Sequence, residues 1–242
     1  MRSTITSFNG SSFSFLAGFG TFHSVNISYY ISDSGSAIVY KLSDTWEYVA
    51  QNYFPSPKMI LAISNNLYIS AESNIFKTDN NLNVLSQYNA SDTFYQGFYY
   101  NPADNLIYVA SSLSNAIHVF DLNLSFNSSI STSTYSPFSI AGYNSQLYVG
   151  TETGLIVVIV NRTILTSFDG CLGSSNIIRS ILFDQFGYFA STCEDSNKLY
   201  LYTSNGTYTG KSLETPFYAE FIQFDSVGRF VLLSALEISI YY

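Results

Sequence analysis

The chain has 242 residues, of which 47% are hydrophobic and 17% aromatic, so it holds enough apolar material for a large core and is expected to fold. Nine Lys and Arg against 17 Asp and Glu give a formal net charge of -8, which opposes binding to phosphate backbones, so no nucleic-acid partner is expected. The longest apolar run, residues 155–160, is far shorter than the roughly 18 residues of a spanning helix, and no membrane span is predicted.

The first ten residues, MRSTITSFNG, contain no apolar stretch of the kind found in a secretory signal. Two interpretations stay open at this point, a cytosolic chain or a domain taken from a longer one. The rest of the chain is rich in β-branched, aromatic, Ser and Asn residues and poor in helix formers, which favours an all-β protein.

A short strand signature with an aromatic second residue recurs six times. These aromatic residues are 38, 40, 40, 41 and 41 positions apart, a period typical of four-stranded propeller blades. In chain order they are Tyr30, Tyr68, Tyr108, Tyr148, Phe189 and Phe230. We therefore predict one domain, residues 1–242, folded as a six-bladed β-propeller with blades at roughly 20–54, 55–90, 91–135, 136–169, 170–213 and 214–242 plus 1–10.

The third repeat shows the order within a blade most clearly. It predicts four strands, called A to D in chain order, and the A–B turn has the sequence Asn-Pro-Ala-Asp-Asn, whose residues favour turns. The predicted strands are 96–100, 106–110, 116–121 and 128–134. His118 falls in strand C and is interpreted as a packing residue.

The last repeat predicts strands A, B and C at 218–224, 229–233 and 236–242, and no strand D follows. Residues 2–10 (RSTITSFNG) match residues 162–170 (RTILTSFDG), which are strand D of the fourth repeat and its exit turn. We therefore expect the N-terminal strand to complete the last blade, because this pairing removes an open sheet edge.

The third repeat contains the segments 101–111 (NPADNLIYVAS) and 114–121 (SNAIHVFD). These segments resemble the NHL and YVTN-type repeat. In that repeat a turn, an IYVA strand, a polar loop with Asn and an I-x-V-F-D strand follow one another. The pattern covers all six repeats, and the third and fifth are close in residue identity. The resemblance implies a six-bladed propeller of that superfamily, whose members are ligand-binding or protein-binding modules more often than enzymes. It specifies no activity, since one fold hosts many.

In propellers of this kind the A strands line a central channel, and the D–A and B–C loops share one face. Aligning the A strands on their exit turns brings one side chain per repeat to the channel mouth, and the resulting mixture of charge, amide and aromatic ring suits a ligand pocket. The predicted ligand-binding ring is His23, Lys58, Gln96, Phe138, Arg179 and Glu220. The alternative is that Arg179 and Glu220 pair and merely satisfy buried charge, with His23 structural.

The B–C loops carry an acidic set whose oxygens suit a hard divalent cation. Its members are Asp33, Glu72, Glu152, Glu194, Asp195 and Glu237. They come from separate repeats and form no calcium-loop motif, so solvated loop tips are the alternative interpretation. Motifs for serine hydrolysis, zinc proteolysis and phosphate binding are absent, so we predict no catalytic residue, no metal ligand and no cofactor other than an optional divalent cation.

Cys171 lies in the D–A loop and Cys193 in the B–C loop of the fifth repeat, on the same predicted face. A disulfide between them would contribute on the order of 3 kcal/mol. Two free thiols are the alternative.

Seven Asn-x-Ser/Thr sequons occur, and five of them are predicted glycosylation sites in C–D connections or near D–A loops. These five are Asn89, Asn123, Asn127, Asn161 and Asn205, and the other two are Asn9 and Asn26. Together with the cysteine pair and the scarcity of Lys, they favour an extracellular or lumenal location, in which case the chain is expected to be part of a longer protein.

The sequence thus predicts a non-catalytic binding module, a monomer or a domain of a larger protein, that recognises a protein or small ligand through its loop face. A metal-dependent propeller enzyme of the lactonase or lyase class, using Glu220 and rim carboxylates, is the competing hypothesis. A scaffold domain without a ligand of its own is a third.

Overall fold

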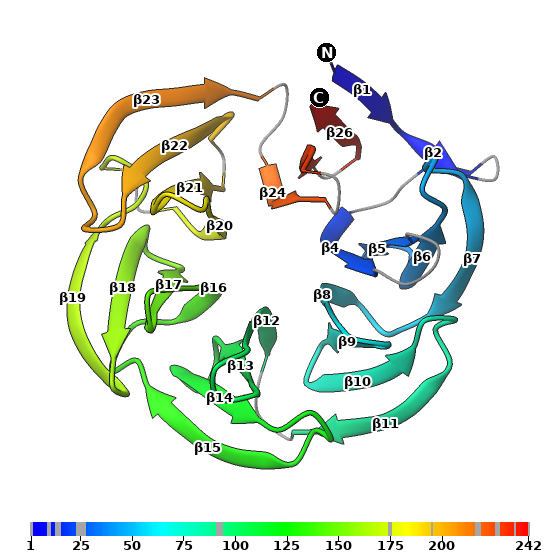
Figure 1. Cartoon of the computed structure of the whole chain (residues 1–242), viewed down its shortest axis with the longest axis horizontal. Helices are drawn as coiled ribbons and strands as arrows, with labels where there is room; N and C mark the ends of the chain where they lie inside the picture. Colours follow the sequence, from blue (N-terminus) through cyan, green and yellow to red (C-terminus); the bar gives the residue numbers. More distant parts are fainter. Residues whose placement is uncertain are drawn as a thin grey trace. The chain divides into compact units, whose positions relative to one another are not determined.

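The computed structural model describes residues 2–8, 11–12, 16–22, 28–90, 94–173, 176–194, 196–215, 219–225, 228–234 and 236–241. Regular structure in these ranges consists of strands, arranged as six four-stranded antiparallel sheets and one two-stranded hairpin (Figure 1). The ranges contain no helix that is long and apolar enough to cross a membrane. Each four-stranded sheet corresponds to one sequence repeat, so the all-β prediction and the six four-stranded blades are confirmed.

The chain divides into two compact units. Unit 1 comprises Met1–Ser91 and Glu220–Tyr242, and unit 2 comprises Asp92–Ala219. The single domain predicted for residues 1–242 stays a prediction.

Unit 1 contains three of the sheets. The first consists of β4 (Leu16–Phe22), β5 (Ser28–Asp33), β6 (Ile38–Leu42) and β7 (Tyr48–Tyr53). The second consists of β8 (Pro57–Ile63), β9 (Asn66–Ala71), β10 (Asn74–Asp79) and β11 (Val84–Asn89). The third consists of β24 (Ala219–Phe224), β25 (Phe230–Ser234), β26 (Ile238–Tyr241) and β1 (Arg2–Ile5).

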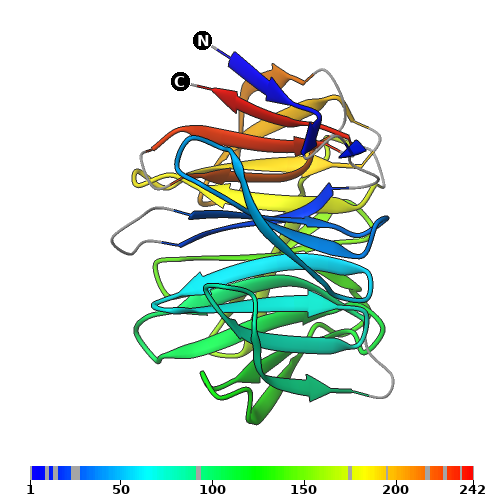
Figure 2. The same ribbon diagram turned by 90° about the vertical axis from the view of Figure 1, so that its right-hand side faces the viewer.

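The beginning and the end of the chain meet in this third sheet. Strand β1 pairs antiparallel with β26, from Arg2 opposite Tyr241 to Ile5 opposite Ile238 (Figure 2). The predicted completion of the last blade by the N-terminal strand is therefore confirmed. The strand is shorter than predicted, because β2 (Ser7–Phe8) turns back and pairs with β3 (Ser11–Ser12). The residues between β2 and β3 are Asn-Gly, the dipeptide preferred in two-residue hairpin loops.

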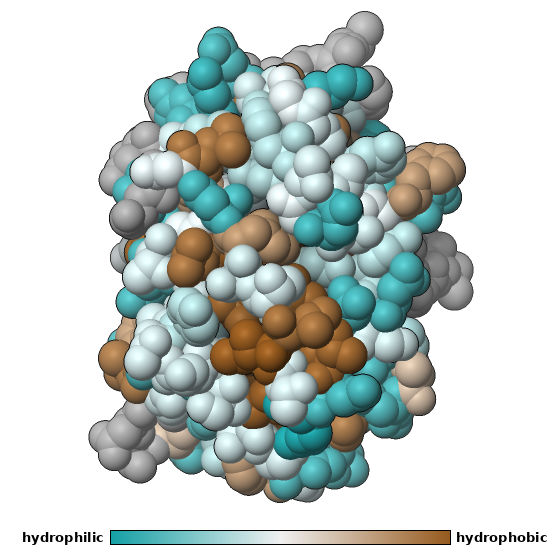
Figure 3. All heavy atoms as spheres, turned by 90° about the vertical axis from the view of Figure 1, so that its left-hand side faces the viewer, coloured by the Kyte–Doolittle hydropathy of each residue, from teal (hydrophilic) through white to brown (hydrophobic). Residues whose placement is uncertain are grey.

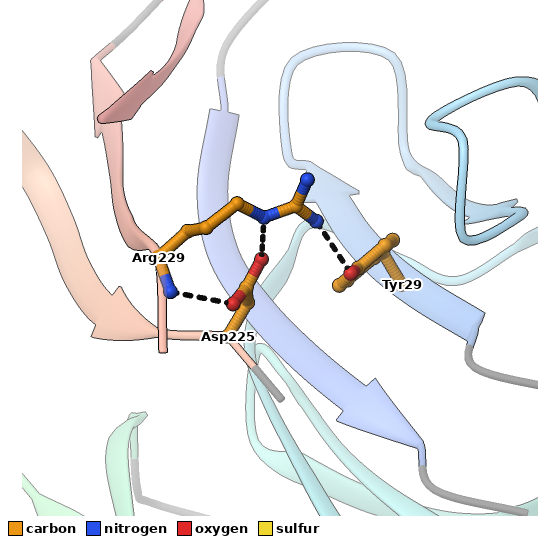
Figure 4. Close-up of polar contacts among 3 residues, drawn as sticks. All are labelled: Tyr29, Asp225 and Arg229. Atoms are coloured by element: carbon orange, nitrogen blue, oxygen red, sulfur yellow. Dashed lines mark hydrogen bonds and ion pairs between the residues drawn. The ribbon is translucent and has the colours of Figure 1, made fainter. Parts of the chain in front are cut away.

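Polar and aromatic side chains join the last sheet of unit 1 to the first. Arg229 donates from Nε to the carboxylate of Asp225 at 2.6 Å and from Nη2 to the hydroxyl of Tyr29 at 2.7 Å (Figure 4). The ring of Tyr29 stacks on Trp46, with ring centroids 4.2 Å apart. The blade that contains both chain ends is thus held to the first blade by a buried ion pair, a hydrogen bond to Tyr29 and the stacked rings of Tyr29 and Trp46.

Unit 2 contains the remaining three sheets. The first consists of β12 (Tyr95–Asn101), β13 (Leu106–Ser111), β14 (Ala116–Phe120) and β15 (Phe126–Ser131). The second consists of β16 (Pro137–Tyr143), β17 (Gln146–Thr151), β18 (Leu155–Val160) and β19 (Thr163–Asp169). The third consists of β20 (Ile178–Phe183), β21 (Tyr188–Cys193), β22 (Lys198–Thr203) and β23 (Tyr208–Glu214).

The recurring aromatic residue of strand B is a core residue. Tyr30, Tyr148 and Phe189 are at most 2% exposed. The hydroxyl of Tyr30 donates to the carbonyl of Asn80, and that of Tyr148 donates to the carbonyl of Ser204, each in the C–D turn of the next sheet. The forty-residue period therefore reflects the packing of each blade on its neighbour, as expected for propellers.

Candidate functional site

The D–A and B–C loops of unit 2 lie at one end of its sheets. In each sheet the backbone N–H after strand B donates to the carbonyl just before strand A, from Ser112 to Phe94, from Glu152 to Ser136 and from Glu194 to Ile177. We call this end, formed by residues 112–115, 132–136, 152–154, 170–173, 176–177, 194 and 196–197, the loop end. Because the strands are antiparallel, the A–B and C–D turns lie at the opposite end, the turn end.

Five of the six predicted ring residues occupy one equivalent place, the second position of strand A. They are Lys58 in β8, Gln96 in β12, Phe138 in β16, Arg179 in β20 and Glu220 in β24. The strand register supports this equivalence. In the sheets of the first four of these residues, the residue that precedes the ring residue is opposite the last residue of strand B.

The first blade departs from the prediction. Leu16 pairs with Asp33, the last residue of β5, so the second position of this strand is Ala17 and not His23. In the sequence, His23 comes directly after Phe22, the last residue of β4, and it lies outside the described residues. The sequence alignment failed here because the first repeat has no clear A–B turn from which to count.

Arg179 is the centre of a small cluster at the loop end of unit 2. Its guanidinium carbon lies 4.7 Å from the ring centroid of Phe138, and Nη2 forms an ion pair with a carboxylate oxygen of Glu194. The two charged side chains are 18% and 29% exposed. An Arg held over a ring and beside a carboxylate is ordered in advance, and most of its rotamer entropy is already lost before any partner arrives.

The pairing of Arg179 with Glu194 was missed by sequence reasoning. The B–C loop acids were treated as a separate set, although the loop that carries Glu194 enters the same end of the blade as Arg179. The alternative pairing with Glu220 joins residues of the two units and stays a prediction. Glu220 itself is 7% exposed.

Lys58 and Gln96 are the ring residues in β8 and β12. Both residues are half-buried. The carbonyl of Lys58 accepts a hydrogen bond from the hydroxyl of Ser32 at 2.7 Å, which ties β8 to the end of β5.

Two of the acidic B–C residues accept hydrogen bonds from groups close to them in the chain. The carboxylate of buried Asp33 accepts hydrogen bonds from the backbone N–H groups of Gly35 and Ser36, and that of Glu237 accepts one from the hydroxyl of Ser239. Glu72 and Glu152 are exposed, and Asp195 lies outside the described residues. Across the described ranges, no group of three or more His, Cys, Asp and Glu is placed to hold a metal ion.

Cys171 and Cys193 form a disulfide, with their Cα atoms 5.9 Å apart. Of the two alternatives drawn from the sequence, the structure contains the bridge. It fixes the D–A loop to the end of β21, directly before Glu194, and so holds the carboxylate that pairs with Arg179.

Two leucines protrude at the loop end of unit 2. Leu113, in the B–C loop of the first sheet, is 68% exposed, and Leu172, beside the disulfide, is 45% exposed. Sequence reasoning missed them, although each stands out as an apolar residue among Ser, Asn and Gly in its loop. Both leave apolar area in contact with solvent at the loop end.

His118 was predicted to be a packing residue and is one. Its ring is half-buried, Nδ1 lies 3.0 Å from the hydroxyl of Tyr95, and Nε2 lies 3.3 Å from that of Ser114. Burial lowers the pKa of His118 below its ordinary value.

No protein-family model matches the chain, and no curated protein matches it. Solved structures do match. The WD40 β-propeller domain of Doa1 has a TM-score of 0.74 at 12% identity, covering 97% of this chain and 80% of that one.

Two further propellers are similarly close in structure. Streptogramin B lyase has a TM-score of 0.71 at 10% identity, covering 99% of this chain and 97% of that one. The β-propeller domain of Cps50 (Swd1) from Myceliophteria thermophila has a TM-score of 0.71 at 10% identity, covering 97% and 85%. At such low identity these likenesses show the fold alone, and the fold is a six-bladed β-propeller of four-stranded blades.

Proposed function

We propose that this chain is a non-catalytic propeller module, similar to NHL-type modules, that binds a protein through the loop end of unit 2. The observation that carries the proposal is the ordered Phe138–Arg179–Glu194 cluster at the same end of the unit as the exposed side chains of Leu113 and Leu172. Arg and aromatic residues contribute most of the binding energy at protein interfaces, and exposed apolar side chains supply area to bury.

The balance of apolar and charged groups favours a protein over a small ligand as the partner. Two leucines on separate loops suit an extended apolar surface better than a deep pocket. The ion pair is partly exposed, at 18% for Arg179 and 29% for Glu194, and can exchange one of its partners for a carboxylate or a guanidinium of the other protein.

We also propose an extracellular or lumenal location. The support is the disulfide, since such bridges persist in oxidising compartments and are rare in the cytosol. The five described sequon asparagines are all exposed, which is compatible with glycosylation in that compartment.

A metal-dependent enzyme of the lactonase or lyase class is the second candidate. Its support is Glu220, a buried carboxylate at the second position of β24, the place equivalent to Arg179. Elemental analysis and thermal melting in EDTA and in excess Ca²⁺ test this candidate. A metal that binds the native state raises Tm by mass action, and no bound metal with no shift in Tm would reject it.

Partner binding is tested by quantitative affinity capture with the chain as bait. The variant Leu172→Ser removes apolar area at the loop end, and Phe186→Ser is its matched control, because Phe186 is 74% exposed in the A–B turn at the other end of the same sheet. We expect a partner that is retained by the wild type and by Phe186→Ser and is lost with Leu172→Ser. Equal retention by both variants would refute the proposed surface.

A further inference from the structure

Two cavities open at the turn end of unit 2, one between its first and second sheets and one between its second and third. The larger has a volume of about 320 Å³ and is lined by Tyr143, Tyr148, Leu165, Phe168 and Asn205, among others. The smaller has a volume of about 170 Å³. In both, a sequon asparagine from the C–D turn of one sheet faces tyrosines of the preceding sheet, Asn205 in the larger cavity and Asn161 in the smaller.

The side-chain amide of Asn205 is arranged so that its nitrogen is left for another bond. Its oxygen Oδ1 accepts hydrogen bonds from the backbone N–H of Thr207, at 3.2 Å, and from the hydroxyl of Thr203. A backbone N–H can only donate, so the atom facing Thr207 must be the oxygen. The nitrogen Nδ2 has no hydrogen-bond partner within the described ranges, and the residue is exposed.

The larger cavity has the chemistry of a sugar-binding surface. None of its lining residues is charged, and amide side chains stand beside aromatic rings. Amides pair with sugar hydroxyls in either direction, since they both donate and accept hydrogen bonds. The C–H faces of a sugar pack on aromatic rings such as those of Phe168 and Tyr143.

The surface beside the cavity is apolar and uncovered in the bare polypeptide. Leu165 is 65% exposed and Ile164 is 37% exposed, both in the outer strand β19. Figure 3 shows hydrophobic atoms gathered on the face of the molecule that β19 presents. Gly206, next to the sequon asparagine, leaves room for the ring of Phe168, because a Cβ there would lie 2.5 Å from it.

We propose that Asn205 carries an N-linked glycan and that the first sugars of this glycan lie in the larger cavity, against Phe168 and Leu165. This proposal rests on the proposed extracellular or lumenal location, not on the proposed partner. In the modification, Nδ2 of Asn205 attacks the anomeric carbon of a lipid-pyrophosphate-linked oligosaccharide. The C–N bond forms, the bond from that carbon to the pyrophosphate oxygen breaks, the lipid pyrophosphate leaves, and Nδ2 loses one proton. No oxidation or reduction occurs.

The smaller cavity repeats the arrangement with different polarity. Asn161 is exposed and lies near Tyr99 and Tyr108, but Asp104 and Arg162 also line the cavity. Its smaller volume and its charged lining suit a sugar less well. A glycan at Asn161 is therefore expected to be held less closely than the one at Asn205.

The first test is site occupancy in the chain secreted from a eukaryotic host behind an added signal. Release of N-glycans by amidase in ¹⁸O water converts each modified Asn to labelled Asp, which peptide mass spectrometry locates. We expect the label at Asn205 in most molecules. An unlabelled Asn205 in the secreted, folded chain would overturn the proposal.

The second test is whether the sugar packs on the protein. The variant Thr207→Ala removes the sequon hydroxyl but keeps the backbone N–H that bonds Asn205, so the turn is preserved. We expect the secreted Thr207→Ala chain to melt about 3 °C below the secreted wild type, which corresponds to a contribution of about one kcal/mol. The same substitution should have no effect on chain made without glycans in bacteria.

The matched control is the sequon at Asn89, the exposed last residue of β11, which lines neither cavity. Loss of its glycan in Asn89→Gln is expected to leave Tm unchanged. In a Leu165→Ser background the effect of Thr207→Ala should shrink to half or less. If Thr207→Ala and Asn89→Gln lower Tm equally, the glycan at Asn205 does not occupy the cavity.

Discussion

Replacement of Arg229 by Met tests how the blade that contains both chain ends is joined to the first blade. The carboxylate of Asp225 is fully buried and accepts hydrogen bonds from both Nε and the backbone N–H of Arg229, whose side chain is 19% exposed. Met keeps much of the volume but removes the cation. Breaking a fully buried ion pair costs roughly 3–5 kcal/mol, and the partial exposure of the guanidinium places this case near the lower end, at about 3 kcal/mol.

The variant also loses the hydrogen bond to Tyr29 and the cation beside Trp46. For a chain of this length, about 3 kcal/mol corresponds to a fall in Tm of roughly 6–12 °C, measured by circular dichroism. The double variant Arg229→Met, Asp225→Asn removes the buried charge together with its partner and should recover part of the loss. A fall of less than 2 °C, or no recovery in the double variant, would refute the importance of this contact.

Three further predictions concern ionisation, the disulfide and the terminal strand. Burial, helped by the hydrogen bond to Asp104, raises the pKa of Tyr108 from 10.0 to about 12. The unfolded chain therefore loses this proton first as pH rises, so stability should fall between pH 10 and about 12, and denaturant midpoints should show a smaller fall for Tyr108→Phe. Reduction of the disulfide between Cys171 and Cys193 should lower the free energy of unfolding by on the order of 3 kcal/mol, as measured by urea titration with and without reductant. The N–H groups of alternate residues of β1 face β26, so one of Ser3→Pro and Thr4→Pro should remove a hydrogen bond between the strands and cost about 2 kcal/mol, whereas Thr6→Pro, outside the strand, should cost little in the same assay.

The repeat could be predicted from the sequence because one buried residue marks it. Tyr30 and Tyr148 donate to the C–D turn of the next sheet, and Tyr68 is buried at the equivalent position of its own sheet, so each is required as a large residue at a fixed interval. Such a residue is constrained by packing and leaves a period in the sequence. The pairing of β1 with β26 could be predicted for a related reason, since residues 2–10 keep the pattern of strand D.

The outer strands were harder to place. Six of the seven residues of β19 and four of the six residues of β11 are exposed, so no core position fixes their register. The hairpin of β2 and β3 was not predicted, because residues 2–10 match a D strand with its exit turn and were interpreted as one. Here a local turn preference prevailed over the repeat pattern.

The candidate site could be predicted by position but not by contact. The second position of strand A was recovered in five blades because a turn follows at a nearly constant distance. The partner of Arg179 depends on how the B–C loop folds back on the D–A loop, and the disulfide fixes that path. The place of Leu113 and Leu172 in the site likewise follows from loop geometry, for which the sequence has no periodic signal.

We propose that the loop end of unit 2 binds a partner protein. The most direct test is quantitative affinity capture with three baits, namely the wild type, the double variant Leu113→Ser, Leu172→Ser, and the turn-end control Phe186→Ser. The proposal predicts a partner, identified by mass spectrometry, that binds the wild type and the control equally and the double variant at least tenfold less. Equal capture by all three baits, or loss with the control alone, would contradict it.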